Sequence, residues 1–555
     1  MGGRRGIPEA ARVPDAAPAP AGRHHRRQGA RGPQVARRRQ RRRRSRRVDR
    51  EPSRRRRHSR ARDDLPALAH HVRRTTVADV VVDGLKRAGT PRIFGVPSGG
   101  ANLALVEAAR AAGLPTTLAS GETAACIMAA VTGDLVDAAG AVVIGPGPGV
   151  AAAIAGVVHG LLDRAPVVLL TSGHPTAVLA CKETLGVEPE SAAHRVAHAA
   201  RLTMSEPRGP VHLDVAAEIL ARPAVPVATS CRPDPLPYPE ASELDAAARV
   251  LSGASRPLLL AGLHCRSAGA AQWLRALAEA LPAPLLATAR AKGALPDPHP
   301  LMLGVLGAAG IEDRLLSRAD LVVGIGLDAL EPVPAACWST APLLGFGPPQ
   351  ALDDWVPALQ VLGDIGAVIE ELAQRLRDQP RADWDVAELD RLRREGAARC
   401  AGDGLTARVV RLAREATPAG TIATVDAGQH HACVASAWPA VAPREFLTSN
   451  GLATAGFALP AAIAAHLVHP DRRVVCFTST AGLTAAATEL GTAARLGAPI
   501  VVVAFRDAAV DASDPVRLAR SFGVASSAAD GAETFAAALG RALRGADPAV
   551  ISVLA

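Results

Sequence analysis

The stretch that most constrains the fold of this chain covers residues 421–507. Within it, a β-branched apolar run leads into a cluster of small residues at 474–483, and the pattern becomes helical at 485–496. A second apolar run follows at 499–505. Strand, small-residue loop, helix and strand make up a βαβ unit, and the loops of such units lie at the carboxyl edge of a parallel sheet.

The small residues of that loop have two interpretations. They allow a phosphate group to approach the backbone, where the N-terminus of the next helix supplies N–H groups and a positive dipole. An ordinary turn between strand and helix in an α/β enzyme has the same composition. This stretch alone leaves both interpretations open.

Apolar runs alternate with amphipathic segments along most of the chain, beginning at Thr76. A proline-rich connector at 223–239 and a charged segment at 378–404 interrupt the alternation. The sequence therefore predicts an α/β protein with three doubly wound parallel-sheet domains. We place these domains at residues 75–222, 240–377 and 405–555.

The positive net charge of +10 comes from the N-terminal segment. Residues 1–74 hold 25 of the 63 basic residues and six of the 53 acidic ones, which leaves 38 basic and 47 acidic residues in the remainder. The remainder is mildly acidic and gives no electrostatic reason to expect nucleic-acid binding. We expect residues 1–74 to be a disordered, arginine-rich tail, because like charges repel and apolar periodicity is missing.

Two interpretations of this tail stay open. It can be coding sequence upstream of the true start, since the folded pattern begins abruptly at Thr75, or it can be an arm that contacts nucleic acid. It lacks the apolar segment of a secretory signal.

No apolar run in the chain reaches the 18 residues of a membrane-spanning helix. The eight cysteines are scattered and include no CxxC pair, so neither a metal site nor a disulfide framework is expected. We therefore expect reduced thiols, a cytoplasmic location and no contact with a membrane.

Several ordered segments resemble one known family. In the first domain they are Phe94-Gly95-Val96-Pro97, Glu122 at the start of a helix, and Gly147-Pro148-Gly149. In the central domain the segment is Lys292-Gly293-Ala294-Leu295-Pro296. In the third domain they are Asp426-Ala427-Gly428-Gln429-His430, Thr448-Ser449-Asn450-Gly451-Leu452 and Gly456-Phe457-Ala458-Leu459-Pro460. Over about residues 75–555 the chain resembles thiamine-diphosphate (ThDP) enzymes of the acetolactate synthase type.

The resemblance implies a pyrimidine-binding domain, a central domain and a diphosphate-binding domain. It also implies a homodimer or homotetramer, because the family's active site lies between two chains, and a small 2-oxoacid as the substrate. In the family, a glutamate at the position of Glu122 hydrogen-bonds the aminopyrimidine and promotes formation of the ylid that attacks the oxoacid.

Such a glutamate needs an apolar pocket in which its pKa can rise towards neutrality. Ala125, Ile127 and Met128 follow Glu122 and suit that requirement. The alternative is an exposed glutamate that is favourable at a helix N-terminus for electrostatic reasons.

The resemblance also assigns cofactor-binding positions in the third domain. These are Gly428, Gln429, His430, Ala453, Ala455, Thr480, Ala481, Gly482 and Asp507. Thr480 and Asp507 occupy the positions of the aspartate and asparagine that bind Mg²⁺ in the family.

The chain departs from the family where the metal binds. The Gly-Asp-Gly motif reads Ser479-Thr480-Ala481 here, and a neutral threonine hydroxyl is a poor ligand for Mg²⁺. Either Asp507 supplies the missing carboxylate or the metal site has degenerated. Arg506, beside Asp507, can also contact a diphosphate directly.

Other departures concern the substrate and the flavin. Ala455 stands where a bulky methionine commonly supports the bent cofactor. The arginine that binds the second oxoacid in acetolactate synthases has no match at 328–334. FAD follows from the resemblance alone, because no GxGxxG motif follows the strands that end at Gly262 and Gly326.

The sequence leaves two functions open. The chain is a ThDP-dependent enzyme that decarboxylates or joins 2-oxoacids, or it is a catalytically silent paralogue that serves as a binding or partner subunit.

Overall fold

The structure is a computed structural model that describes residues 75–97, 101–172, 180–308, 310–334, 337, 341–349, 357–376, 382–401, 404–506 and 513–554. The tail predicted at residues 1–74 and the predicted ligand Asp507 lie outside this part of the chain. In the described residues the strands form three separate sheets of six strands each, and every strand pairing within them is parallel. This confirms the predicted fold class, whereas the predicted domain boundaries stay a prediction.

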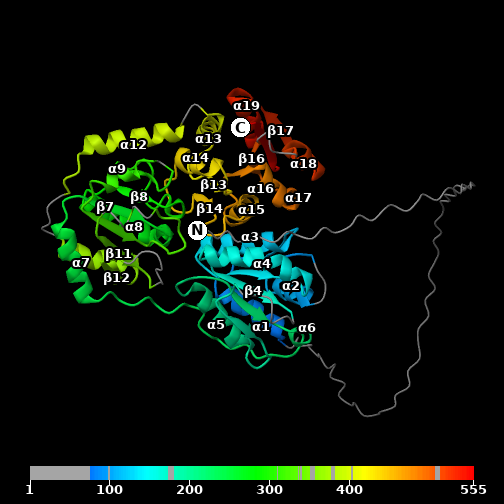
Figure 1. Cartoon of the computed structure of the whole chain (residues 1–555). Coiled ribbons are helices and arrows are strands. Elements are labelled where there is room, and N and C mark those ends of the chain that lie inside the picture. Colours follow the sequence, from blue (N-terminus) through cyan, green and yellow to red (C-terminus); the bar gives the residue numbers. More distant parts are fainter. Residues whose placement is uncertain are drawn as a thin grey trace, which may run out of the picture. The chain divides into compact units, whose positions relative to one another are not determined.

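The first sheet has the strand order β2-β1-β3-β4-β6-β5. Its strands are β1 (Ile93–Gly95), β2 (Thr116–Leu118), β3 (Gly140–Val143), β4 (Val167–Thr171), β5 (Thr184–Gly186) and β6 (Val211–Asp214). Its helices are α1 (Val77–Arg87), α2 (Ala101–Ala111), α3 (Glu122–Val136), α4 (Pro148–Leu162), α5 (Ala192–Met204) and α6 (Ala217–Leu220). Helices α1 and α5 pack on one face of the sheet, and α3 and α4 pack on the other (Figure 1).

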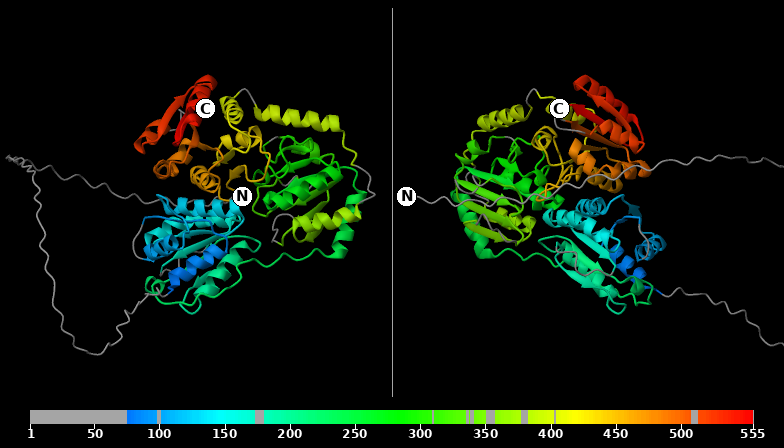
Figure 2. Two further views of the ribbon diagram at one scale, coloured as in Figure 1. Left: turned by 180° about the vertical axis from the view of Figure 1, so that it is seen from behind. Right: turned by 45° about the vertical axis from the view of Figure 1, so that its right-hand side comes forward.

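The second sheet has the order β12-β11-β10-β7-β8-β9 and is drawn in green in both views of Figure 2. Its strands are β7 (Pro257–Ala261), β8 (Leu285–Ala287), β9 (Met302–Val305), β10 (Leu321–Ile325), β11 (Leu343–Gly347) and β12 (Leu359–Leu362). Around it lie α7 (Ala241–Gly253), α8 (Ala268–Ala280), α9 (Glu312–Leu316), α11 (Ile365–Arg375) and the 3₁₀ turns η1 (Leu263–Arg266) and η2 (Ala289–Ala291). Helix α12 (Val386–Ala401) follows and buries Leu389 and Leu392 against this domain.

The third sheet has the order β14-β13-β15-β16-β18-β17. Its strands are β13 (Ile422–Val425), β14 (Phe446–Thr448), β15 (Val474–Ser479), β16 (Ile500–Arg506), β17 (Ala525–Ala529) and β18 (Ala549–Leu554). Its helices are α13 (Leu405–Glu415), α14 (His430–Ala437), α15 (Ala458–Val468), α16 (Thr480–Ala485), α17 (Thr488–Leu496), α18 (Pro515–Ser521) and α19 (Ala532–Arg544).

The prediction of a small-residue loop after β15 was wrong. Helix α16 begins at Thr480, directly after the strand, because the Ser479 hydroxyl accepts a hydrogen bond from Gly482 N (3.1 Å) and caps the helix. A second helix, α17, then starts at Thr488. The small residues therefore form the first turn of a helix.

One hydrophobic core is shared by the first and third domains. It contains Ile127 and Ala130 of α3, Val157 of α4, Ile463 of α15 and Leu490 of α17. Aliphatic side chains from both sheets complete it, which joins segments that are far apart in the sequence. Among the described residues, no helix combines the length and hydropathy needed to cross a membrane.

Candidate functional site

Glu122 is the first residue of α3 and lies at the carboxyl edge of the first sheet, just after β2. Its side chain is partly exposed, whereas Ala125, Ile127 and Met128 behind it are fully buried. A Cβ atom added at Gly149, in the first turn of α4, would lie 3.2 Å from Glu122 Oε1. Glycine at this position therefore leaves room for the carboxylate.

Helices α3 and α4 cross closely because residue 156 is glycine. A Cβ atom there would lie 2.6 Å from Cys126 Cβ and 2.7 Å from the Thr123 carbonyl oxygen, distances that real structures do not show. The crossing holds the first turn of α4 beside the first turn of α3. The geometry around Glu122 thus follows from small residues in the sequence.

The carboxyl edge of the third sheet is organised by a buried aspartate, Asp426, which follows β13. Its carboxylate accepts hydrogen bonds from the Thr478 hydroxyl (2.5 Å) and from Ala458 N (2.9 Å). Burial raises the pKa of Asp426 to about 6, although these hydrogen bonds act in the opposite direction. A Cβ atom at Gly482 would lie 2.4 Å from Asp426 Oδ2, so α16 can rest on this carboxylate only with glycine at that position.

Thr480, Ala481 and Gly482 form the first turn of α16. The Thr480 side chain is only 3% exposed, and its hydroxyl lies 3.5 Å from the Phe505 carbonyl oxygen. Ala481 is exposed and Gly482 is buried. The structure therefore brings these three predicted residues together at the edge of the sheet.

Gly428, Gln429 and His430 lie at the same edge, where α14 begins. Gly428 has φ of +151°, which favours glycine, and a Cβ atom there would lie 3.0 Å from the His430 ring. The His430 side chain is buried, and its Nε2 atom has no hydrogen-bond partner. Burial lowers the pKa of His430 to about 4, so the ring is neutral at pH 7.

Ala453 and Ala455 lie in the loop before α15, and both are exposed. Ala453 has φ of +47°, in the left-handed region that costs free energy for a residue with a Cβ atom. Strain of this kind persists where the surrounding structure fixes the backbone, and it is common at ligand sites.

A cavity of about 380 Å³ lies beside these residues, between the central and third domains. Its walls include Gly428, His431, Ser449 and Ala453 from the third domain and Arg290 from η2. His431 lines this cavity as well, and its Nε2 lies 2.9 Å from the Thr448 hydroxyl. Glu122 is not part of its wall.

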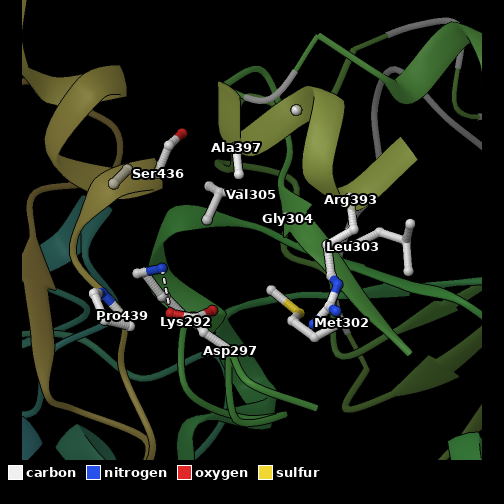
Figure 3. A pocket seen from close by; sticks show the side chains of 12 residues that line it. Lys292, Asp297, Met302, Leu303, Gly304, Val305, Arg393, Ala397, Ser436 and Pro439 are labelled. Atoms are coloured by element: carbon white, nitrogen blue, oxygen red, sulfur yellow. Dashed lines mark hydrogen bonds and ion pairs between the residues drawn. The ribbon is translucent and has the colours of Figure 1, made fainter. Parts of the chain in front are cut away.

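A smaller cavity of about 130 Å³ lies between β9, α12 and α14 (Figure 3). The buried Lys292 amino group contacts Asp297 Oδ2 at 2.6 Å and faces the ring of Phe446. Asp297 Oδ2 also accepts a hydrogen bond from Ala440 N (2.6 Å), so the Lys292–Asp297 pair contributes to the packing of the central domain against the third.

The three domains meet around Asp134, a buried residue of α3 that the sequence analysis did not single out. Arg266 Nε lies 2.7 Å from Asp134 Oδ1, Arg290 Nη2 lies 3.3 Å from Oδ2, and Arg444 Nη2 lies 3.6 Å from Oδ1. Arg290 also donates to the Thr448 carbonyl oxygen (2.8 Å), at the edge of the third sheet. A charged residue within an apolar helix is a signal that could have identified this junction.

His159 also lies between domains. Its ring is buried, with Nδ1 3.2 Å from the Ser449 hydroxyl and Nε2 3.6 Å from Asp163 Oδ2. Asp163 Oδ1 in turn accepts a hydrogen bond from Asn450 N (2.7 Å). These contacts fix the Thr448–Leu452 segment against the end of α4.

The anionic end of thiamine diphosphate fits the carboxyl edge of the third sheet. The first turn of α16 has N–H groups without partners inside the helix, and His430 Nε2 is a buried polar atom without a partner. A magnesium site is not assembled by the described residues alone. Of the two predicted ligands only Thr480 is described, and no group of three or more His, Cys, Asp and Glu side chains in the described ranges could hold a metal ion.

Comparisons with known proteins agree with this architecture. Models of the thiamine pyrophosphate enzyme N-terminal TPP binding domain, central domain and C-terminal TPP binding domain match residues 75–194, 244–372 and 426–513. The chain is 29% identical over 457 residues to the acetolactate synthase isozyme 1 large subunit of Escherichia coli, which covers 76% of this chain and 80% of that protein.

Two further relatives extend the comparison. A probable 2-ketoarginine decarboxylase of Pseudomonas aeruginosa is 29% identical over 469 residues, covering 78% of this chain and 82% of that protein. An X-ray structure of a protein assigned as a thiamin diphosphate-dependent enzyme from Mycobacterium smegmatis superposes with a TM-score of 0.72. That comparison covers 87% of this chain and 100% of the other at 21% identity, and it shows the fold.

The chain belongs to the family of thiamine-diphosphate-dependent enzymes. Within that family it is similar to the large subunits of acetolactate synthases.

Proposed function

We propose that this chain is a ThDP-dependent enzyme that decarboxylates 2-oxoacids or joins them through a new carbon–carbon bond. The observation that carries this proposal is the position of Glu122, at the start of α3 with its carboxylate beside Gly149 and apolar residues behind it. One relative named above, a probable 2-ketoarginine decarboxylase, acts on a 2-oxoacid by its name.

When bound, thiamine diphosphate would supply a nucleophilic ring carbon and a cationic ring that serves as an electron sink in the decarboxylation of a 2-oxoacid. In our proposal Glu122 holds or releases a proton at the aminopyrimidine. His430 and the first turn of α16 hold the diphosphate, and the buried residues of α3 exclude water behind Glu122.

We propose that the complete site forms between two copies of the chain, in a dimer or tetramer. Glu122 belongs to the first domain and does not line the cavity beside the third-domain residues. Helix α4 contains no Asp, Glu, Lys or Arg and leaves Ile154 46% exposed, while Leu452, beside Ala453, is 38% exposed. Exposed apolar side chains beside both halves of the site are suited to an interface with a second copy of the chain.

The second candidate function, a silent partner subunit, is favoured by the threonine at position 480. A working metal site in our first proposal requires Asp507 to supply the carboxylate that Thr480 lacks.

A cytoplasmic location is part of both proposals. In the described part of the chain, seven cysteines are free thiols, as is common in a reducing compartment.

Calorimetric titration of thiamine diphosphate into the full chain, with and without Mg²⁺, separates the two functions. Micromolar, metal-dependent binding followed by CO₂ release from a panel of 2-oxoacids supports the enzyme. The panel includes pyruvate and an oxoacid with a guanidinium group. Thr480→Asp is the matched variant, because it restores the family's metal ligand. No binding at millimolar cofactor by the native chain, together with binding by Thr480→Asp, supports the silent subunit.

A further inference from the structure

Helix α3, which starts with Glu122, has no cap of its own. The residue before it is Gly121, which has no side chain to accept a hydrogen bond from the first turn. The first turn, with Glu122 at its start, therefore gains no support from a side-chain cap of its own. The position of Glu122 therefore depends on groups outside the helix.

A carboxylate of the third domain instead holds the two residues that precede the helix. Glu489, in the first turn of α17, is 1% exposed, and its Oε1 atom accepts hydrogen bonds from Ser120 N and Gly121 N, both at 3.0 Å. The Ser120 hydroxyl donates to the Thr488 carbonyl oxygen (3.0 Å) and lies 2.9 Å from the Thr492 hydroxyl. These contacts hold the residues just before Glu122 against α17.

Burial of Glu489 costs free energy, because the charged carboxylate loses its contact with water. This desolvation raises the pKa of the carboxyl, and the hydrogen bonds offset only part of that rise. An apolar residue would fill the same space between the domains without that cost. What the carboxylate adds is a fixed position for two backbone N–H groups.

We infer that Glu489 is a positioning residue: it fixes the start of α3 and thereby the direction of the Glu122 carboxylate. The inference rests on the proposed function as far as Glu122 acts on the cofactor. From the hydrogen bonds alone we predict a change in backbone hydrogen exchange, which does not depend on activity.

The test is hydrogen exchange of the full chain, followed by mass spectrometry of a peptide that spans residues 114–124. In Glu489→Ala we expect exchange on the order of tenfold faster than in the native chain, since two backbone donors, Ser120 N and Gly121 N, lose their acceptor. In Glu489→Gln we expect native-like exchange, because the amide oxygen can accept both hydrogen bonds. Should Glu489→Ala fail to fold, Glu489→Asp shortens the side chain by one methylene and is expected to give intermediate exchange.

Glu445→Ala is the matched control. Glu445 is also buried and accepts two backbone hydrogen bonds, from Val441 N (2.8 Å) and Ala442 N (3.2 Å), and these residues and its ion-pair partner Arg472 all belong to the third domain. We expect it to lower the melting temperature while exchange in the 114–124 peptide stays native. Native exchange of that peptide in a folded Glu489→Ala or Glu489→Asp variant overturns the inference.

Turnover gives the second measurement. We expect kcat to fall on the order of 10- to 100-fold in Glu489→Ala with little change in KM, and Glu489→Gln to recover most of it. Equal activity in native chain and Glu489→Ala also overturns the inference. A native chain that shows no turnover contradicts the proposed function, and the exchange experiment then decides the role of Glu489 by itself.

Discussion

Replacing Asp134 with asparagine should destabilise the whole three-domain junction. Asp134 is 4% exposed, and the guanidinium groups of Arg266, Arg290 and Arg444 surround its carboxylate. In Asp134→Asn these buried cations lose their shared anion, which costs about 3–5 kcal/mol. At about 2–4 °C per kcal/mol for domains of this size, the melting temperature at pH 7 should fall on the order of 10 °C.

The pH dependence of this difference tests the electrostatic reasoning. Burial alone would raise the pKa of Asp134, but these three arginines, together with Arg208, outweigh it and hold the pKa well below its ordinary value. A carboxylate with a depressed pKa stabilises the folded state above its unfolded pKa of about 3.9, and that contribution is lost as the pH falls towards the folded pKa. The melting temperatures of the native chain and the variant should therefore converge below about pH 4.

Asp137→Asn is the control, one turn further along the same segment. Asp137 also contacts Arg208, at 2.6 Å, but its side chain is 49% exposed. An exposed pair contributes about 0–1 kcal/mol, so its melting temperature should change by a few degrees at most. If Asp134→Asn melts like Asp137→Asn, or if its deficit is the same at pH 7 and pH 3, the reasoning is refuted.

Three further predictions concern the third domain. Gly482→Ala should lower the melting temperature, because its Cβ atom would lie 2.4 Å from Asp426 Oδ2, and overpacking of this kind costs about 1–3 kcal/mol; an unchanged melting curve contradicts the geometry at α16. His430→Gln should reduce the loss of stability between about pH 6.5 and pH 4, because burial lowers the pKa of His430 to about 4 and only the unfolded chain takes up a proton in that range. Urea titrations at pH 7 and pH 5 measure the free energy of unfolding. A pH 7 to pH 5 difference as large in the variant as in the native chain refutes this prediction. Ala453→Gly should raise the melting temperature slightly, by the equivalent of about 0.5–1 kcal/mol, because φ of +47° is strained for alanine; a lower melting temperature excludes that strain.

The fold was predictable because its signal is local and repeated. Apolar runs of strand length alternate with helical segments, and each βαβ unit carries that pattern in its own residues. The error after β15 was also local: the Ser479 cap starts a helix where the small residues predicted a loop. Capping by a single serine outweighed the composition of the segment.

The interactions around the candidate site were harder to predict because they join distant residues. Glu489 contacts a backbone 368 positions away, and Arg290 reaches Asp134 from another domain. Nothing in the sequence near Glu122 shows that the two residues before its helix are held from the third domain. Such contacts are specified by the packing of complete domains, which local patterns do not contain.

The core shared by the first and third domains has a consequence for synthesis on the ribosome. Helix α3 is complete at Val136, but α15, which covers part of it, begins only at Ala458. At roughly 5–20 residues per second, the ribosome takes on the order of tens of seconds to make the missing partner. Until then the part of α3 that α15 covers is exposed to solvent, so the nascent first domain is a natural client for a chaperone.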